Sequence, residues 1–223
     1  MNTLETELYF KQGFEIILNN AKEQIESAKI LAKEKKYAPA IALLIIAAEE
    51  AMKGQTAYTQ LFFPNAPEID FSKYYKDHKT KLEGIRGTIL ITELLDKSFE
   101  IITNEIINKK EDEDTNTAYN RGIKKFTDYL TDLTENGNEE FDNELEWWKH
   151  AKGLKEDCLY VRKNGKSWHN PQKTTKKLYD KTLLYVEQFV NNVDYINNID
   201  TEKEPYKKIT KKFKDFITTN IKT

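Results

Sequence analysis

Apolar residues recur at steps of three and four from Thr6 to Lys35, and this spacing constrains the fold more than any other feature of the chain. Because such steps place side chains on one face of an α-helix, the segment is predicted to form one long amphipathic helix. The apolar run from Ala38 to Ala48 follows, with Pro39 where the first turn of a second helix tolerates proline. That helix is expected to end near Gln60. Together the two predict an N-terminal helical hairpin.

The composition favours helices throughout. Of 223 residues only 8 are Gly and 5 are Pro, whereas 32% are charged, a balance typical of long solvated helices and poor for a turn-rich β-sandwich. The only strand-like pattern is the short segment 159–161, and 163–166 has turn composition. Further periodic segments predict helices over 73–91 or on to 108, then 119–133, 141–160 and 174–192, with loops at 61–71 and 109–116.

These segments predict an all-α fold, a bundle of five to seven helices built on the N-terminal hairpin. We expect one domain over residues 1–198, followed by a C-terminal segment, 199–223, in which Pro205–Ile221 forms a basic amphipathic helix. That helix is expected to pack on or beside the bundle. Its apolar stripe comprises Ile209, Phe213, Phe216 and Ile217.

Several classes of protein lack support in the sequence. The longest apolar run has 11 residues, well short of the roughly 20 that a membrane span needs. The net charge is −2, Cys158 is the only cysteine, and no charged-apolar-small signal opens the chain, so a cytoplasmic protein without membrane contact is expected. No phosphate-binding Gly loop, nucleophile elbow or HExxH motif occurs.

The histidines do not predict a metal site. They lie at positions 78, 150 and 169, none at helical spacing from another, and only one cysteine could join them. We therefore expect neither a metal nor a cofactor.

Charge is unevenly distributed along the chain. Residues 149–181 hold ten Lys or Arg and three acids, whereas 132–146 hold seven acids and no base. A basic stretch with interleaved aromatics is typical of RNA binding, and Tyr160, Trp168 and Tyr179 are candidates to stack on unpaired bases. The alternative is a dipolar surface whose two halves pair with each other.

Two acids and a lysine end the most apolar stretch. Glu49, Glu50 and Lys53 are spaced so that either carboxylate can lie beside the lysine on one helix face. Continuation of the apolar stripe directs Glu49, and with it Lys53, towards the interior. Burying charge is costly unless each group is paired, so the cluster is either a functional site or an ion pair at the edge of the core.

Two histidines are candidates to carry protons. His78 stands beside Lys79 and Lys81, and imidazole is the side chain best suited to general acid or base work near neutral pH. Arg162 and His169 would supply a phosphate clamp and a base for a 2′-hydroxyl, although the turn between them allows a purely structural interpretation.

Four motifs occur in order with characteristic gaps: Asn20-Ala21 with Ala28-x-x-Leu31; Tyr37-Ala38-x-Ala40-x-Ala42 leading to Glu49-Glu50-x-x-Lys53; His78-Lys79-x-Lys81; and Lys155-x-x-Cys158-Leu159-Tyr160-Val161 with Gly165, Trp168 and Pro171. In this order they resemble the AbiV-type abortive infection family over residues 8–190. That family is grouped with the HEPN superfamily of helical bundles, whose members are often dimeric and often ribonucleases in phage defence.

The resemblance implies a bacterial antiphage effector, and a homodimer. Its polar positions carry over as Glu49, Glu50, Lys53, His78 and Lys155, some of them on a common groove. The superfamily's signature of Arg, four to six residues, then His corresponds to Arg162 and His169 at its longest spacing.

Two functions stay open on the sequence alone. In the first, the protein is a metal-independent ribonuclease or RNA- or translation-targeting toxin, with catalytic candidates His78, Glu50, Lys53, Arg162 and His169. Its RNA-binding or groove candidates are Glu49, Lys79, Lys81, Lys155, Tyr160 and Trp168.

In the second function, the protein is a non-catalytic helical module that binds a phage or host protein. The cluster of polar residues around Glu49 and His78 is then a buried network that fixes the bundle.

Overall fold

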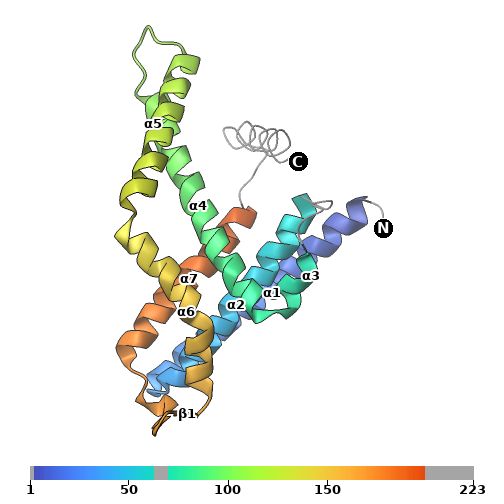
Figure 1. Cartoon of the computed structure of the whole chain (residues 1–223). Helices are drawn as coiled ribbons and strands as arrows, with labels where there is room; N and C mark the ends of the chain where they lie inside the picture. The colour runs from blue at the N-terminus through green and yellow to red at the C-terminus, as the bar shows by residue number, and fades with distance from the viewer. Residues whose placement is uncertain (1–2, 63–69, 199–223) are drawn as a thin grey trace.

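The computed structural model describes residues 3–62 and 70–198. Within these ranges the chain is almost entirely helical, which confirms the all-α prediction (Figure 1). The helix expected at 205–221 lies outside the described residues. The elements are α1 (Thr3–Lys33), α2 (Tyr37–Phe62), α3 (Phe71–Lys76), α4 (His78–Ile107), α5 (Thr115–Asn136), α6 (Glu139–Leu159), β1 (Arg162–Asn164), β2 (Ser167–His169), the 3-10 turn η1 (Pro171–Lys173) and α7 (Lys176–Asn198).

The N-terminal hairpin forms as predicted. Helices α1 and α2 lie side by side, and the chain reverses at Lys35, which adopts a positive φ of 56°. The backbone N–H groups of Lys35 and Lys36 donate to the carbonyls of Ala32 and Leu31, both at 2.9 Å, so the end of α1 keeps its hydrogen bonds. The small buried residues Ala21 and Ala28 of α1 allow the helices to approach closely.

Helix α2 is the centre of the bundle because its apolar residues cover all sides of the helix rather than one stripe. Ile41, Leu44 and Ile45 are fully buried, and α1, α4, α6 and α7 all pack around them. Trp148 of α6 and Phe189 of α7 close the core at a ring-centroid distance of 6.0 Å. A residue of α2 that points into the bundle is therefore surrounded by other helices.

The third helix differs from its prediction. The helix predicted to begin at 73 and to end at 91 or 108 is divided at Asp77, where α3 ends and α4 begins, and α4 then continues to Ile107. The Asp77 carboxylate accepts hydrogen bonds from the backbone N–H of Thr80 at 2.6 Å and from its hydroxyl at 2.7 Å. This cap stabilises a new helix start at His78, so α3 does not continue into α4. His78 is consequently the first residue of α4.

Helices α4 and α5 extend from the body as an antiparallel arm (Figure 1). They approach closely at Gly122, where an added Cβ would lie 2.9 Å from the Ile102 Cα. Arg121 of α5 bridges the carboxylates of Glu105 and Glu113. The expected loop over 109–116 is shorter than predicted, because the Asp114 cap starts α5 at Thr115.

The strand prediction at 159–161 was wrong. Helix α6 continues to Leu159, and the strands are instead β1 and β2, which pair antiparallel around the turn expected at 163–166. Gly165 in that turn has a φ of 58°, a conformation that glycine adopts without strain. Of the helices described, none has both the length and the apolar character required to cross a bilayer.

Candidate active site

Helices α2, α4 and α6 bring four polar side chains to one place. Glu49 of α2 is only 2% exposed, and its carboxylate contacts the Lys155 Nζ of α6 through one oxygen and the His78 Nδ1 of α4 through the other. Lys81, one turn after His78, places its Nζ 3.8 Å from the same carboxylate. The Lys155 Nζ lies 3.3 Å from the His78 Nδ1. His78 and Lys155 therefore share the Glu49 carboxylate, although they lie 29 and 106 positions from Glu49 in the sequence.

These contacts explain why Glu49 can be buried. A buried carboxylate is tolerated only when it is paired and hydrogen-bonded, and here Lys155 and Lys81 are buried with it at 7% and 4% exposure. Burial lowers the pKa of the Lys81 ammonium, and the attraction of Glu49 opposes that effect. The two lysines and one carboxylate leave a net positive charge beneath His78.

His78 links this buried cluster to solvent. Its side chain is 57% exposed, although its Nδ1 contacts a carboxylate that is nearly inaccessible. Contact with Glu49 favours the tautomer in which Nδ1 carries the proton and donates it to the carboxylate. In that tautomer the Nε2 atom carries the ring's lone pair, and it has no hydrogen-bond partner among the described residues. This is the geometry of a general base held by an orienting carboxylate.

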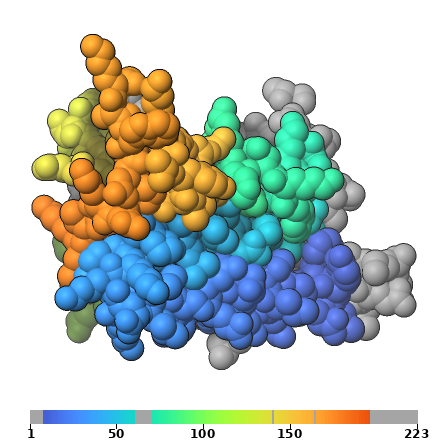
Figure 2. Space-filling view, turned by 90° about the horizontal axis from the view of Figure 1, so that it is seen from below, coloured from blue at the N-terminus to red at the C-terminus, as the bar shows by residue number. Residues whose placement is uncertain are grey.

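The three helices that carry the cluster border a hollow in the molecular surface. In the space-filling view the start of α4 (teal) and the end of α6 (amber) stand above α2 (lighter blue) with a hollow between them (Figure 2). Glu49, His78 and Lys155 come from the three elements that border this hollow.

Glu50 and Lys53 form a second pair on the adjoining face of α2. Lys53 contacts the Glu50 carboxylate, which also accepts a hydrogen bond of 3.5 Å from the Asn20 side chain of α1. The sequence spacing allowed Lys53 to pair with either Glu49 or Glu50. In the structure it pairs with Glu50, because Glu49 points into the bundle. Lys79 lies apart on the outer face of α4, 3.7 Å from Glu83, with its side chain 73% exposed.

Arg162 and His169 meet, but not at this cluster. They are direct partners across the hairpin of β1 and β2. Arg162 contacts the Glu156 carboxylate and lies 3.4 Å from that of Asp157, and the His169 Nε2 donates to the Asp157 carbonyl at 2.8 Å. Both side chains are thus attached to the last turn of α6.

Of the three aromatic residues predicted to stack on RNA bases, two are exposed and one is buried. Tyr160 and Trp168 are 59% and 68% exposed, and Trp168 lies opposite Lys163 in the hairpin. Tyr179 is only 6% exposed and packs on Tyr37 at a ring-centroid distance of 5.9 Å, so the expectation that it stacks on bases was wrong. Its place on the inward face of α7 is the reason.

Sequence reasoning missed the residue that positions His78. Asp77 caps α4, and its pKa is lowered chiefly by the hydrogen bonds from Thr80, with the charge of Lys152 adding to the effect. The Asp-x-x-Thr spacing before a periodic segment is a capping signal and could have located the start of the helix. Within the described ranges, no three His, Cys, Asp or Glu side chains are grouped so as to hold a metal ion.

The fold and cluster define a class of protein: an all-α, HEPN-like bundle whose central helix supplies a buried carboxylate to a histidine and two lysines. The chain belongs to the AbiV family of HEPN proteins, which it matches over residues 10–191. The matched range contains every member of the cluster. Membership indicates a role in abortive infection, a form of defence against phage. No curated protein and no solved structure shows significant similarity to the chain.

Proposed function

We propose that this protein is an abortive-infection effector that cleaves RNA without a metal ion, with His78 as its proton-carrying residue. The observation that supports this most strongly is an exposed imidazole whose Nδ1 contacts the buried Glu49 carboxylate, beside the ammonium of Lys155. A base, its orienting group and positive charge for a phosphate are the parts that such a reaction requires.

In the proposed reaction, the His78 Nε2 removes the proton from a ribose 2′-hydroxyl. The resulting oxyanion attacks the adjacent phosphorus, the bond from phosphorus to the 5′-oxygen breaks, and that oxygen takes a proton from water. A 2′,3′-cyclic phosphate and a 5′-hydroxyl end result. Glu49 stabilises the imidazolium that forms, and the positive charge of Lys155, Lys81 and Lys53 favours the phosphorane-like transition state.

The test uses infected cells, because infection supplies any phage trigger that the effector requires. Bacteria that produce wild-type protein, His78→Ala or His169→Ala are challenged with a phage that the wild type restricts. Plaque numbers are counted and RNA ends are mapped by sequencing. The expected result is that His78→Ala abolishes both protection and new 5′-hydroxyl RNA ends, whereas His169→Ala retains both.

Other results would contradict the proposal. Protection by His78→Ala equal to that of the wild type would exclude His78 as the proton carrier. Protection without new RNA ends in the wild type would exclude ribonuclease activity. Loss of function in His169→Ala alone would transfer the active site to the β1–β2 hairpin. Circular dichroism and thermal unfolding of each purified variant show whether it is folded.

One observation favours a second candidate, a non-catalytic module that binds a phage or host protein. The buried contacts of Glu49 with Lys155 and Lys81 join three helices, which is also what a purely stabilising network would do. If that is its role, His78→Ala stays active, and substitutions of Glu49 act only through loss of folded protein.

The proposal includes three further expectations. RNA is the substrate, a phage-encoded protein is the trigger or the target, and the active protein is a cytoplasmic homodimer. Size-exclusion chromatography with light scattering of the full chain tests the oligomer, since a monomeric mass at micromolar concentration would contradict it.

A further inference from the structure

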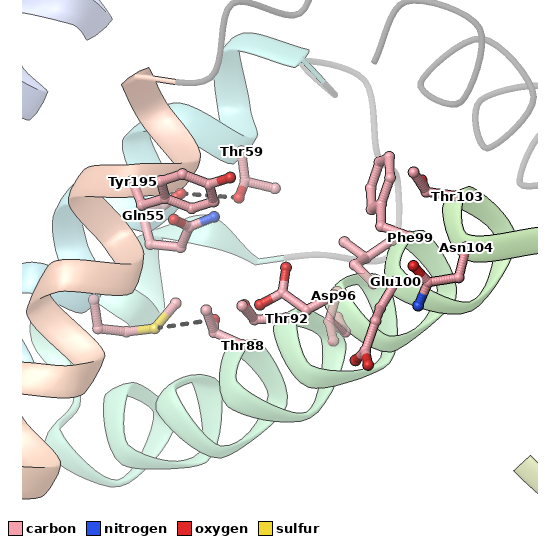
Figure 3. A pocket seen from close by; sticks show the side chains of 13 residues that line it. Gln55, Thr59, Thr88, Thr92, Asp96, Phe99, Glu100, Thr103, Asn104 and Tyr195 are labelled. Atoms are coloured by element: carbon pink, nitrogen blue, oxygen red, sulfur yellow. Dashed lines mark hydrogen bonds between the residues drawn. The ribbon is translucent and has the colours of Figure 1, made fainter. Parts of the chain in front are cut away.

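A cavity of about 620 Å³ opens between α2, α4 and α7, on a different side of α2 from Glu49 (Figure 3). Helix α4 forms most of its wall, from Thr88 to Asn104, and Tyr195 closes it from α7. At a rise of about 1.5 Å per residue, the α4 wall is roughly 24 Å long. The cavity is therefore an elongated groove along α4.

An apolar stripe runs along this wall. Ile91, Leu95 and Phe99 follow one another at steps of four, so they lie on one face of α4, and Ile91 is 54% exposed. An apolar stripe of this length that is open to solvent is typical of a surface that receives an amphipathic helix.

Two polar groups in the groove favour a cationic occupant. The Gln55 Oε1 is buried and has no hydrogen-bond partner in the described part of the chain, which is costly unless a donor reaches it. Asp96 lies on the opposite wall, where partial burial raises the pKa of its carboxyl. Both side chains project into the cavity (Figure 3), and Glu100, which pairs with Lys97, adds acidity to the same wall.

The chain itself supplies a segment with the matching properties. Within residues 205–223 there are six lysines and one acid, Asp215. Ile209, Phe213 and Phe216 recur at helical spacing, and the 17 residues of 205–221 would form a helix of roughly 25 Å, the length of the groove wall.

The segment also starts in the right place. Tyr195 lines the groove, and Asn198, only three residues later, ends the described part of α7. The six residues 199–204 can span up to roughly 20 Å when extended. Attachment to the chain gives the segment a high effective concentration at the groove.

We infer that residues 205–221 of this chain bind as a helix in the groove between α2, α4 and α7. Its apolar stripe covers Ile91, Leu95 and Phe99, and its lysines pair with Asp96 and donate to Gln55. The inference does not depend on the ribonuclease proposal.

Hydrogen exchange of the full chain, followed by mass spectrometry, tests this inference. In the wild type, amides of residues 209–217 are expected to exchange slowly. The double variant Phe213→Asp with Phe216→Asp should accelerate that exchange about tenfold or more. The control, Thr218→Asp with Lys222→Gln, changes the net charge equally on the opposite face of the segment and should leave exchange slow.

One variant in the groove and one control outside it locate the site. Ile91→Asp alters an exposed wall residue and should accelerate exchange of 209–217, whereas Ile107→Asp, on the same helix but outside the groove and 72% exposed, should not. Fast exchange of 209–217 in the wild type would overturn the inference, and so would slow exchange that persists in Ile91→Asp. Protection that disappears on dilution would assign the segment to a second copy of the chain and overturn it equally.

Discussion

The His78 imidazole, more than half exposed, contacts the carboxylate of Glu49, which is 2% exposed. A group in the buried core is therefore in direct contact with a side chain at the surface. A carboxylate that is held in place by Lys155 fixes the orientation of His78 without any surface residue having to do so. We therefore expect substitutions in the cluster to affect the stability of the fold and the function of the site to different degrees, so that single variants can distinguish the two effects.

Glu49→Gln should destabilise the fold strongly. The substitution leaves Lys155 and Lys81 buried without a counter-charge, and removing one partner of a buried pair typically costs about 3 to 5 kcal/mol. Urea denaturation measures the change in the free energy of unfolding. Glu83→Gln, which removes an exposed partner of Lys79, is the control and should change it by less than about 0.5 kcal/mol. A loss below about 1 kcal/mol for Glu49→Gln would show that the cluster contributes little to stability.

Lys81→Met should be as stable as the wild type at neutral pH, or more stable by about 1 to 2 kcal/mol. Glu49 keeps its closer partners, and the desolvation cost of an ammonium disappears. Under the ribonuclease proposal the same variant loses protection against phage, because positive charge at the site is reduced. A stable variant with full protection would exclude a functional role for Lys81.

The pH dependence of Lys81 has a definite sign. Burial lowers the pKa of this ammonium below its ordinary value of 10.5, so the unfolded chain binds more protons in the interval between the two values. The free energy of unfolding of the wild type, relative to Lys81→Met, should therefore rise as the pH increases towards 10.5. Denaturation of both proteins at neutral and alkaline pH measures this difference, and a decrease would contradict it.

Cys158 should have the opposite effect to Lys81 on how the free energy of unfolding changes with pH. Burial raises the pKa of its thiol from 9.0 to about 11, so between these values the folded chain retains a proton that the unfolded chain releases. The stability of the wild type relative to Cys158→Ala should fall by roughly 1 to 2 kcal/mol as the pH rises through this window. The same burial predicts that iodoacetamide modifies Cys158 only after denaturant is added. Rapid modification of the native protein at pH 8 would refute this.

Asp77→Ala should cost about 1 kcal/mol, because it removes the cap of α4. It should also reduce protection against phage more than this loss of stability explains, since the cap fixes the backbone of His78. Asp77→Asn retains an acceptor and should restore both properties. Thermal unfolding and plaque counts on the three proteins check the prediction, and an Asp77→Ala variant with full protection would contradict it.

The fold followed from local pattern to a large extent. The spacing of apolar residues determined the N-terminal hairpin, because a face of apolar side chains at helical period must be buried against another helix. The same pattern directed Glu49 inward. Capping chemistry at Asp77 was also present in the sequence, as was the turn at Gly165.

The tertiary structure decided which polar residues meet. Helical spacing describes neighbours three or four residues apart, and so it associated Lys53 with either glutamate. The partners of Glu49 are instead His78, Lys155 and Lys81, and these depend on how α4 and α6 pack against α2. Packing is set by the shape of the whole core rather than by any local segment. No pattern within one helix could therefore predict that His78 would contact a buried carboxylate, or that His169 would be attached to the end of α6.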